Sequence, residues 1–447
     1  MKLSRLKKLS SSPFAKGIIN FSSGAFVALF LSIVLQFLLP KFLSVEDFGV
    51  YKAFTLYLGY LSLLHFGLKD GIYLRLCEIN SKPRLFTENN LFYSYLFFQQ
   101  LVIAVIGISI ALLMPADYRL FILILSIAAF LSIVVTYFES FYQSLKEFRL
   151  ISYLKILRES IVLVLVGIFI FANINLGINA LLYFIVIKFI LVTVLYKYLT
   201  RQRIKFVPLQ KIINKKGIIL HVYKRGFKLL TGNFGHQLNT NIDKLFVSIY
   251  FSSSEFAIYS FGGVFFVLSN TLVTSFSTVL LPFLHKDFKE ELNSKYQAFE
   301  RRIGYMLALF LPYLTVVVIV VKYLYPEYSE SVRIIAFLSF GMMFNIIISV
   351  VQNNYFKVLK KEKVYVIINY STIALFMISM MTLLMNKADI SKYAILTSVM
   401  FFLRYLANEV YLRKELRLPF GGIVPQNLII IIVGTGVVFL FKLIMNE

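Results

Sequence analysis

The sequence predicts an all-α polytopic membrane protein, and three observations support this fold class. The 447 residues are 59% hydrophobic, with a mean hydropathy of +0.79. Only 15% of them are charged, against about 25% in a typical soluble protein. Apolar runs of about 20 residues, the length that a helix needs to cross a bilayer, recur along the whole chain.

Thirteen membrane-spanning helices are expected from these runs. They are placed at 14–39, 46–76, 89–114, 118–143, 153–173, 178–199, 226–251, 255–284, 300–325, 330–356, 364–385, 391–412 and 425–444. The basic start of the chain resembles a signal peptide, but the apolar run that follows extends to Leu39 and no small-residue cleavage site ends it. We therefore expect a retained first span.

The distribution of Lys and Arg predicts the orientation of the spans. Basic residues gather in alternate loops, most densely in Thr200–Arg225, whereas the opposite loops are short and nearly neutral. Because loops rich in Lys and Arg stay in the cytoplasm, we expect a cytoplasmic N-terminus in a bacterial cytoplasmic membrane. An odd number of spans would place Glu447 outside. The single cysteine, Cys77, excludes an internal disulfide.

Three pairs of similar segments predict a duplication. Residues 44–51 resemble residues 252–259, residues 113–118 resemble 324–328, and residues 142–146 resemble 355–360. The pairs occur in the same order, about 210 residues apart, as expected for two related halves.

The duplication predicts two six-helix lobes related by a pseudo-twofold axis along the membrane normal, plus one extra C-terminal span. We expect an N-terminal lobe at 1–199, a cytoplasmic linker at 200–225, a C-terminal lobe at 226–414 and an additional helix within 415–447. Such a pair of lobes would leave a cleft between them.

The span at 226–251 is too polar for a helix that faces only lipid. At 100° per residue, Asn233, Gln237, Thr240 and Lys244 share one stripe, with His236 at its edge. Polar groups inside a bilayer must face protein or water, so we expect this stripe to line the cleft. In the next span, Asn270 shares a face with two hydroxyl side chains.

Further polar and charged side chains within the spans are candidates for the same cavity. The full candidate set for substrate binding is Asn20, Lys52, Asp70, Lys188, Asn233, His236, Gln237, Thr240, Asp243, Lys244, Asn270, Asn345, Gln352 and Arg404. Structural alternatives remain open: Lys52 can extend to an interface, Asn faces can join helices, and Asp243 can pair locally with Lys244.

Basic residues within the spans outnumber unpaired acidic ones, which favours binding of an anionic group such as a phosphate. We find no histidine–carboxylate cluster for a metal, no nucleophile–base pair and no Gly-rich phosphate loop. The sequence therefore predicts a non-enzymatic transporter without cofactor or metal, and the net charge of +24 does not indicate nucleic-acid binding.

Several motifs resemble those of one transporter family. The join Phe42–Tyr51, the segment from Gly67 to Arg75, and Asn241–Lys244 followed by Glu255–Tyr259 resemble the polysaccharide-export branch of the multidrug/oligosaccharidyl-lipid/polysaccharide exporter superfamily. This is the O-antigen flippase type, with a fold similar to that of multidrug (MATE) transporters. The extra thirteenth span departs from the twelve or fourteen that are usual in the family.

The resemblance implies a flippase that moves a lipid-linked O-antigen or capsule repeat unit, carried on undecaprenyl pyrophosphate, by alternating access. It also implies a coupling ion, H⁺ or Na⁺, contact with membrane lipids and association with glycan polymerase machinery. A drug/cation antiporter and a lipid II-type flippase of the same fold remain alternatives. A membrane polymerase or ligase would need a sizeable outer loop, which the sequence does not show.

Overall fold

The computed structural model describes residues 13–79, 81–201, 204–267, 293, 296 and 310–419, and the regular structure in these residues is helical throughout. The chain divides into two compact units, Met1–Gln237 and Leu238–Glu447. Seven of the described helices are long and apolar enough to cross a membrane. The predicted all-α membrane fold is therefore confirmed, whereas the symmetry between two lobes and their predicted boundaries stay predictions.

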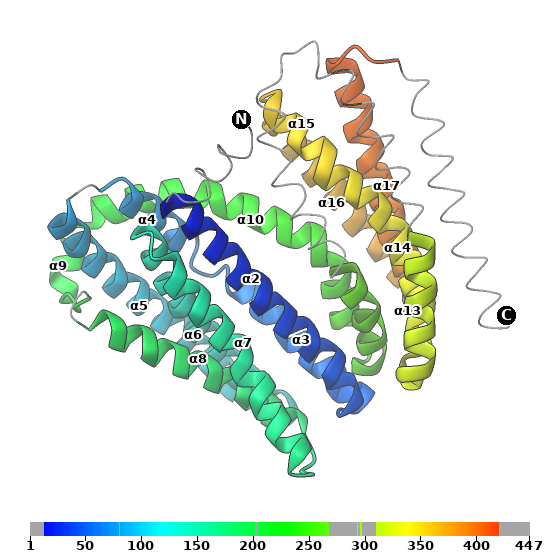
Figure 1. Cartoon of the computed structure of the whole chain (residues 1–447), viewed down its shortest axis with the longest axis horizontal. Coiled ribbons are helices and arrows are strands. Elements are labelled where there is room, and N and C mark those ends of the chain that lie inside the picture. Colours follow the sequence, from blue (N-terminus) through cyan, green and yellow to red (C-terminus); the bar gives the residue numbers. More distant parts are fainter. Residues whose placement is uncertain are drawn as a thin grey trace, which may run out of the picture. The chain divides into compact units, whose positions relative to one another are not determined.

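The described residues of the first unit contain eight α-helices, one 3₁₀ turn and the first part of a further helix. They are α2 (Pro13–Leu38), α3 (Val45–Leu61), α4 (Leu68–Cys77), α5 (Lys82–Leu113), α6 (Ala116–Ser144), α7 (Phe148–Phe171), α8 (Ile178–Thr200), α9 (Leu209–Ile213), the 3₁₀ turn η1 (Leu39–Lys41), and α10 (Lys216–Tyr250) up to Gln237. Helices α2 and α7 lie side by side (Figure 1), and α6 contacts α3, α4, α5, α7 and α8. Helix α6 thus forms the centre of this unit.

The predicted continuous helix at 46–76 is wrong, because the chain breaks between α3 and α4. Phe66 and Gly67 both have positive φ, 51° and 83°, and a left-handed pair of this kind ends a helix. Side chains supply hydrogen bonds to backbone groups that lose their helical partners at this break. His65 Nδ1 accepts the Gly67 N–H at 3.0 Å, and Gln100 donates to the Leu64 carbonyl at 3.3 Å. A break inside hydrocarbon needs such partners. Asp70 therefore belongs to α4, whereas Lys52 belongs to α3.

The second unit begins within α10 and continues through a helix at 253–267. Its other described elements are α13 (Phe310–Leu324), the 3₁₀ turn η2 (Pro326–Tyr328), α14 (Ser331–Ile347), a π-helical turn η3 (Ile348–Gln352), α15 (Asn353–Val358), α16 (Glu362–Met385) and α17 (Ile390–Glu415). Helix α17 contacts both α14 and α16. Gly341 of α14 lies so close to α17 that a Cβ there would be 2.7 Å from Ser398 Cα.

The repeated sequence signals correspond to similar local structures. Ser44 caps α3 by accepting the Asp47 N–H at 3.1 Å, and Ser252 accepts the Glu255 N–H at 3.2 Å while Glu255 accepts the Ser252 N–H in return. The second arrangement is a capping box, which satisfies two otherwise unpaired N–H groups at a helix start. The third pair of segments also matches, because each ends at a lysine with positive φ, Lys146 and Lys360.

Candidate functional site

The polar stripe of α10 is divided between the two units. Within the first unit, Asn233 lies 3.5 Å from the Asp70 carboxylate, and a Cβ added to Gly59 would lie 3.0 Å from Gln237 Nε2. These two stripe residues thus contact α4 and α3 of their own unit. Asp70 also forms an ion pair with Lys69 at 3.8 Å.

Lys188, expected in a cavity, belongs to a network of charged side chains in the first unit. Its Nζ lies 3.5 Å from Glu159, which also accepts a hydrogen bond from Arg158 at 2.9 Å. Arg158 in turn reaches Glu139 at 2.8 Å, and Lys155 lies 3.5 Å from the same carboxylate. The network joins α6, α7 and α8 with three cations and two carboxylates.

Lys52 lies half-buried between α3 and α2. Its Nζ donates to Gln36 Oε1 at 3.0 Å and sits 5.1 Å from the ring centroid of Phe48. An amide oxygen and an aromatic face both stabilise an ammonium group without cancelling its charge. Lys52 thus joins α3 to α2 through a hydrogen bond.

The rest of the stripe lines a cavity in the second unit. This cavity is bounded by Asn239, Thr240, Asp243, Lys244, Gly263, Phe266, Leu338, Thr397 and Phe401. The Asp243 side chain is 5% exposed and accepts a hydrogen bond from Tyr259 at 2.8 Å, and the Tyr259 hydroxyl lies 3.3 Å from Thr397 Oγ1. Lys244 donates to Asn241 at 3.3 Å, and no ion pair within 4.0 Å joins it to Asp243 in the described structure. The two side chains thus form no close ion pair, although Asp243 still interacts electrostatically with Lys244.

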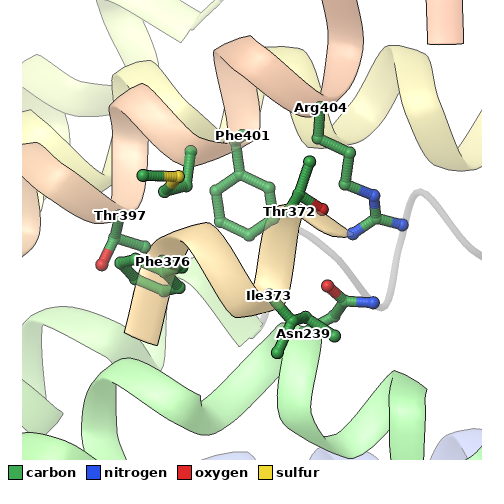
Figure 2. Close-up of a pocket in the computed structure, with 8 residues that line it drawn as sticks. Asn239, Thr372, Ile373, Phe376, Thr397, Phe401 and Arg404 are labelled. Atoms are coloured by element: carbon green, nitrogen blue, oxygen red, sulfur yellow. The ribbon is translucent and has the colours of Figure 1, made fainter. Parts of the chain in front are cut away.

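A second cavity of the same unit contains Arg404. It is lined by Asn239, Thr372, Ile373, Phe376, Thr397, Met400, Phe401 and Arg404, which come from α10, α16 and α17. Figure 2 shows the guanidinium of Arg404 and the amide of Asn239 on the same side of this cavity, with the ring of Phe401 across from them. Asn239, Thr397 and Phe401 line both cavities, so the two adjoin.

Gln352 and Asn345 are buried polar residues of the second unit rather than residues that line either cavity. Gln352 Nε2 donates to the Tyr405 carbonyl at 3.2 Å and to Glu409 at 3.1 Å. Glu409 also accepts from the Tyr296 hydroxyl at 2.6 Å and pairs with Arg413. This cluster is fully buried and satisfies a charge pair in the protein interior, which favours a structural role.

Some expected site residues lie beyond what the structure describes, and some residues of the cavities were not expected. The side chains of Asn20 and His236 and the whole of Asn270 fall outside the described residues. Asn239, Thr397 and Tyr259 line or support the cavities but were not predicted as candidates. Asn239 precedes Thr240 by one residue, which places it 100° around the helix from Thr240 and outside the predicted stripe. No group of three His, Cys, Asp or Glu that could hold a metal occurs in the described part of the chain.

Solved structures with the same fold are membrane transporters. A lipid II flippase, MurJ, in its inward closed conformation matches with a TM-score of 0.68 at 14% identity, over 96% of this chain and 100% of that chain. An inward-facing multidrug resistance MATE transporter of the MOP superfamily matches with a TM-score of 0.63 at 13% identity, over 90% of this chain and 98% of that chain. At this identity the likeness shows a shared fold.

No curated protein sequence matches the chain. A family model described as "polysaccharide biosynthesis protein" matches residues 38–327, which is more than half of the sequence. The match includes the two capped joins and the whole polar stripe of α10. The chain belongs to this polysaccharide biosynthesis protein family.

Proposed function

We propose that this protein is a flippase that moves a lipid-linked oligosaccharide, an O-antigen or capsule repeat unit on undecaprenyl pyrophosphate, from the cytoplasmic to the outer leaflet. Membership of the polysaccharide biosynthesis family is the observation that carries this proposal. The shared fold with transporters that include a lipid II flippase supports it.

The chemistry of such a substrate explains why polar groups are needed in the spans. A sugar–pyrophosphate head cannot cross hydrocarbon unaided, because each unsatisfied polar group there costs several kcal/mol. The polyprenyl tail can stay in lipid throughout. Lys52 lies in α3, and Lys244 lines a cavity of the second unit. Cationic side chains of this kind can attract the pyrophosphate.

The proposed transport cycle is alternating access between two six-helix lobes, 1–199 and 226–414, joined by a basic cytoplasmic linker at 200–225. The segment 415–447 adds a C-terminal span, and the N-terminus lies in the cytoplasm of a bacterium. We propose no catalytic step for the chain itself. Glycosyltransferases and a polymerase would act before and after translocation.

Ion coupling is proposed at Asp243. This carboxylate is buried and bonded to the neutral Tyr259 hydroxyl, and an ionisable group at membrane depth typically marks an ion or proton pathway. Protonation of Asp243, or a Na⁺ bound beside it, would remove the cost of a buried negative charge. The same carboxylate favours a second candidate function, a drug/cation antiporter.

A genetic experiment separates the two candidate functions. A strain that lacks the gene is complemented with the wild-type protein or with Lys52→Ala, Lys188→Ala, Lys244→Ala or Arg404→Ala, and surface glycan is measured. The flippase proposal expects loss of glycan in the deletion strain and reduced glycan in at least the Lys52 and Lys244 variants. Full surface glycan in the deletion strain, together with resistance to cationic dyes on overexpression, would favour the antiporter.

A further inference from the structure

Arg404 is a buried cation whose neighbours are neutral. It is 8% exposed, its Nη2 donates to the Tyr365 hydroxyl at 2.9 Å, and its guanidinium carbon lies 5.7 Å from the ring centroid of Tyr365. Its Nε–H is buried without an acceptor, and no carboxylate comes within 4.0 Å of the guanidinium among the described residues. The Tyr365 hydroxyl leaves the full positive charge in place.

Three other buried or half-buried cations of the second and first units lie against carboxylates in the described structure. Arg413 pairs with Glu409, Arg158 with Glu139 and Glu159, and Lys188 with Glu159. A buried charge without a counter-charge strongly destabilises a fold, because desolvation is not offset by attraction. Arg404 differs in this respect from Arg413, Arg158 and Lys188, and a buried guanidinium with neutral neighbours points to a counter-ion that does not belong to the chain.

The cavity beside Arg404 has the size and the donors for a small anion. About 20 Å³ is available in it to the centres of water-sized groups, and about 10–15 Å³ of such space holds one water. Asn239 can supply amide N–H donors from α10, on the same side of the cavity as the guanidinium of Arg404 from α17 (Figure 2). The remaining walls are mostly apolar: Ile373, Phe376, Met400 and Phe401.

The hydroxyl groups of the two threonines in the cavity already donate their protons to backbone carbonyls. Thr372 Oγ1 donates to backbone carbonyls of α16 at 2.8 and 3.0 Å, and Thr397 Oγ1 donates to the Tyr393 carbonyl at 2.9 Å. The donors that face the cavity thus come from one guanidinium and one amide. Two donor groups around one small space suit a single monovalent anion, whereas a pyrophosphate with two tetrahedral phosphates needs far more room.

We propose that the cavity formed by Asn239 and Arg404 binds one small monovalent inorganic anion, such as chloride, as the counter-ion of Arg404. The anion would receive hydrogen bonds from the Arg404 guanidinium and from the Asn239 amide, and would thereby link α10 to α17 within the second unit. This site is distinct from the binding of the lipid-linked substrate, and it does not require the proposed flippase activity.

The test is thermal unfolding of the purified full-length protein in detergent. Sodium gluconate is replaced stepwise by sodium chloride or sodium bromide at constant ionic strength, since gluconate is too large for the cavity. Ligand that binds only the folded state raises the unfolding midpoint, and we expect a rise of about 2–4 °C at saturating chloride. Asn239→Ala should shift the chloride concentration of half-maximal effect upward several-fold.

Two charge variants complete the design. Arg404→Gln removes the cation from the cavity and should abolish the response to chloride, whereas Lys414→Gln removes a charge from an exposed position of the same helix and should keep it. If Arg404→Gln does not fold, the broadening of the ³⁵Cl resonance by wild type and by Asn239→Ala decides: stronger broadening by wild type supports the site.

Two results would overturn the proposal. One is an equal midpoint in gluconate and chloride for the wild type, or an equal rise in Arg404→Gln. The other is stabilisation by inorganic pyrophosphate that depends on Arg404 while chloride has no effect, since Arg404 would then belong to the substrate site. Neither result bears on whether deletion of the gene abolishes surface glycan, so the two proposals can fail separately.

Discussion

Gly226 of α10 and Gly67 at the start of α4 approach so closely that no side chain fits at either position. A Cβ at position 226 would lie 1.9 Å from the Gly67 carbonyl oxygen and 2.5 Å from the Gly71 nitrogen. Gly71 contacts α10 in the same way, since a Cβ there would lie 2.0 Å from the Val222 carbonyl oxygen. The first half of α10 is therefore held against α4 by direct contact between backbones.

Gly226→Ala should destabilise the protein, because backbone atoms on both helices would have to move apart. Overpacking of this kind costs typically 1–3 kcal/mol, which exceeds the roughly 0.5–1 kcal/mol that alanine gains over glycine in a helix. The measurement is the thermal midpoint in detergent. The matched control is Gly232→Ala in the same helix, where nothing lies within 4 Å of an added Cβ. An equal change in both variants would contradict the contact.

Glu78 and Arg225 lie beside this contact and form a two-pronged ion pair, with distances of 2.8 and 2.5 Å. The hydrogen bond from Arg225 lowers the pKa of Glu78 below its ordinary value of 4.5. A carboxylate whose pKa is lowered in the folded state stabilises the fold when the pH is above its ordinary pKa. This contribution is lost as the pH falls through the pKa of the folded state.

Glu78→Gln should therefore reduce the thermal midpoint slightly at pH 7 and at low salt. The difference from wild type should shrink below pH 4.5 and vanish once Glu78 is protonated in the folded state. Because both groups are exposed, salt should shrink the difference. A difference that persists at low pH would show that the carboxylate charge is not its cause.

The network around Glu159 should behave as a set of mutually dependent charges. Glu159→Gln leaves Lys188 and part of Arg158 uncompensated, and removing one partner of a buried pair costs about 3–5 kcal/mol. We expect a loss of stability near the lower end of this range, because the side chains are 15–19% exposed and water can solvate the remaining charges. The double variant Glu159→Gln, Lys188→Met should recover much of the stability. If the double variant loses as much stability as Glu159→Gln and Lys188→Met lose together, the two residues are not directly coupled.

Asp243→Asn should uncouple transport from its driving ion while preserving the shape of the cavity. The amide oxygen can still accept the Tyr259 hydroxyl, but the side chain no longer binds a proton or a cation. In proteoliposomes, an imposed H⁺ or Na⁺ gradient should accelerate flux in the variant by about tenfold less than in the wild type. Asp389→Asn, at an exposed position before α17, is the control. An undiminished response in Asp243→Asn would exclude this carboxylate as the coupling site.

The fold class was accessible from the sequence because hydropathy and helix-start signals are local. The caps at Ser44 and Ser252 were not predicted, although a hydroxyl three residues before an acidic side chain is a local signal for them. The break at Phe66–Gly67 was not predicted, and it lies where Gly67 meets the backbone of α10, more than 150 residues away. Long-range contacts of this kind leave no periodic signal.

The candidate site was predictable in part for a similar reason. The stripe on α10 indicated Thr240 and Lys244, which do line a cavity. Lys188 was expected in a cavity, but its partner Glu159 comes from α7, and a single sequence does not reveal which helix supplies a counter-charge. Arg404 was recognised as costly to bury, whereas its neutral partner Tyr365 on α16 could be found only from the structure.

Translocation itself is the most direct test of the proposed function. Purified protein is reconstituted with a fluorescent undecaprenyl-pyrophosphate oligosaccharide placed in one leaflet, and a membrane-impermeant quencher reports the fraction that reaches the other leaflet. The flippase proposal predicts protein-dependent transfer that accelerates with an imposed ion gradient and slows in Lys52→Ala and Lys244→Ala. Folded wild-type protein that leaves the glycan in its original leaflet, with and without a gradient, would contradict it.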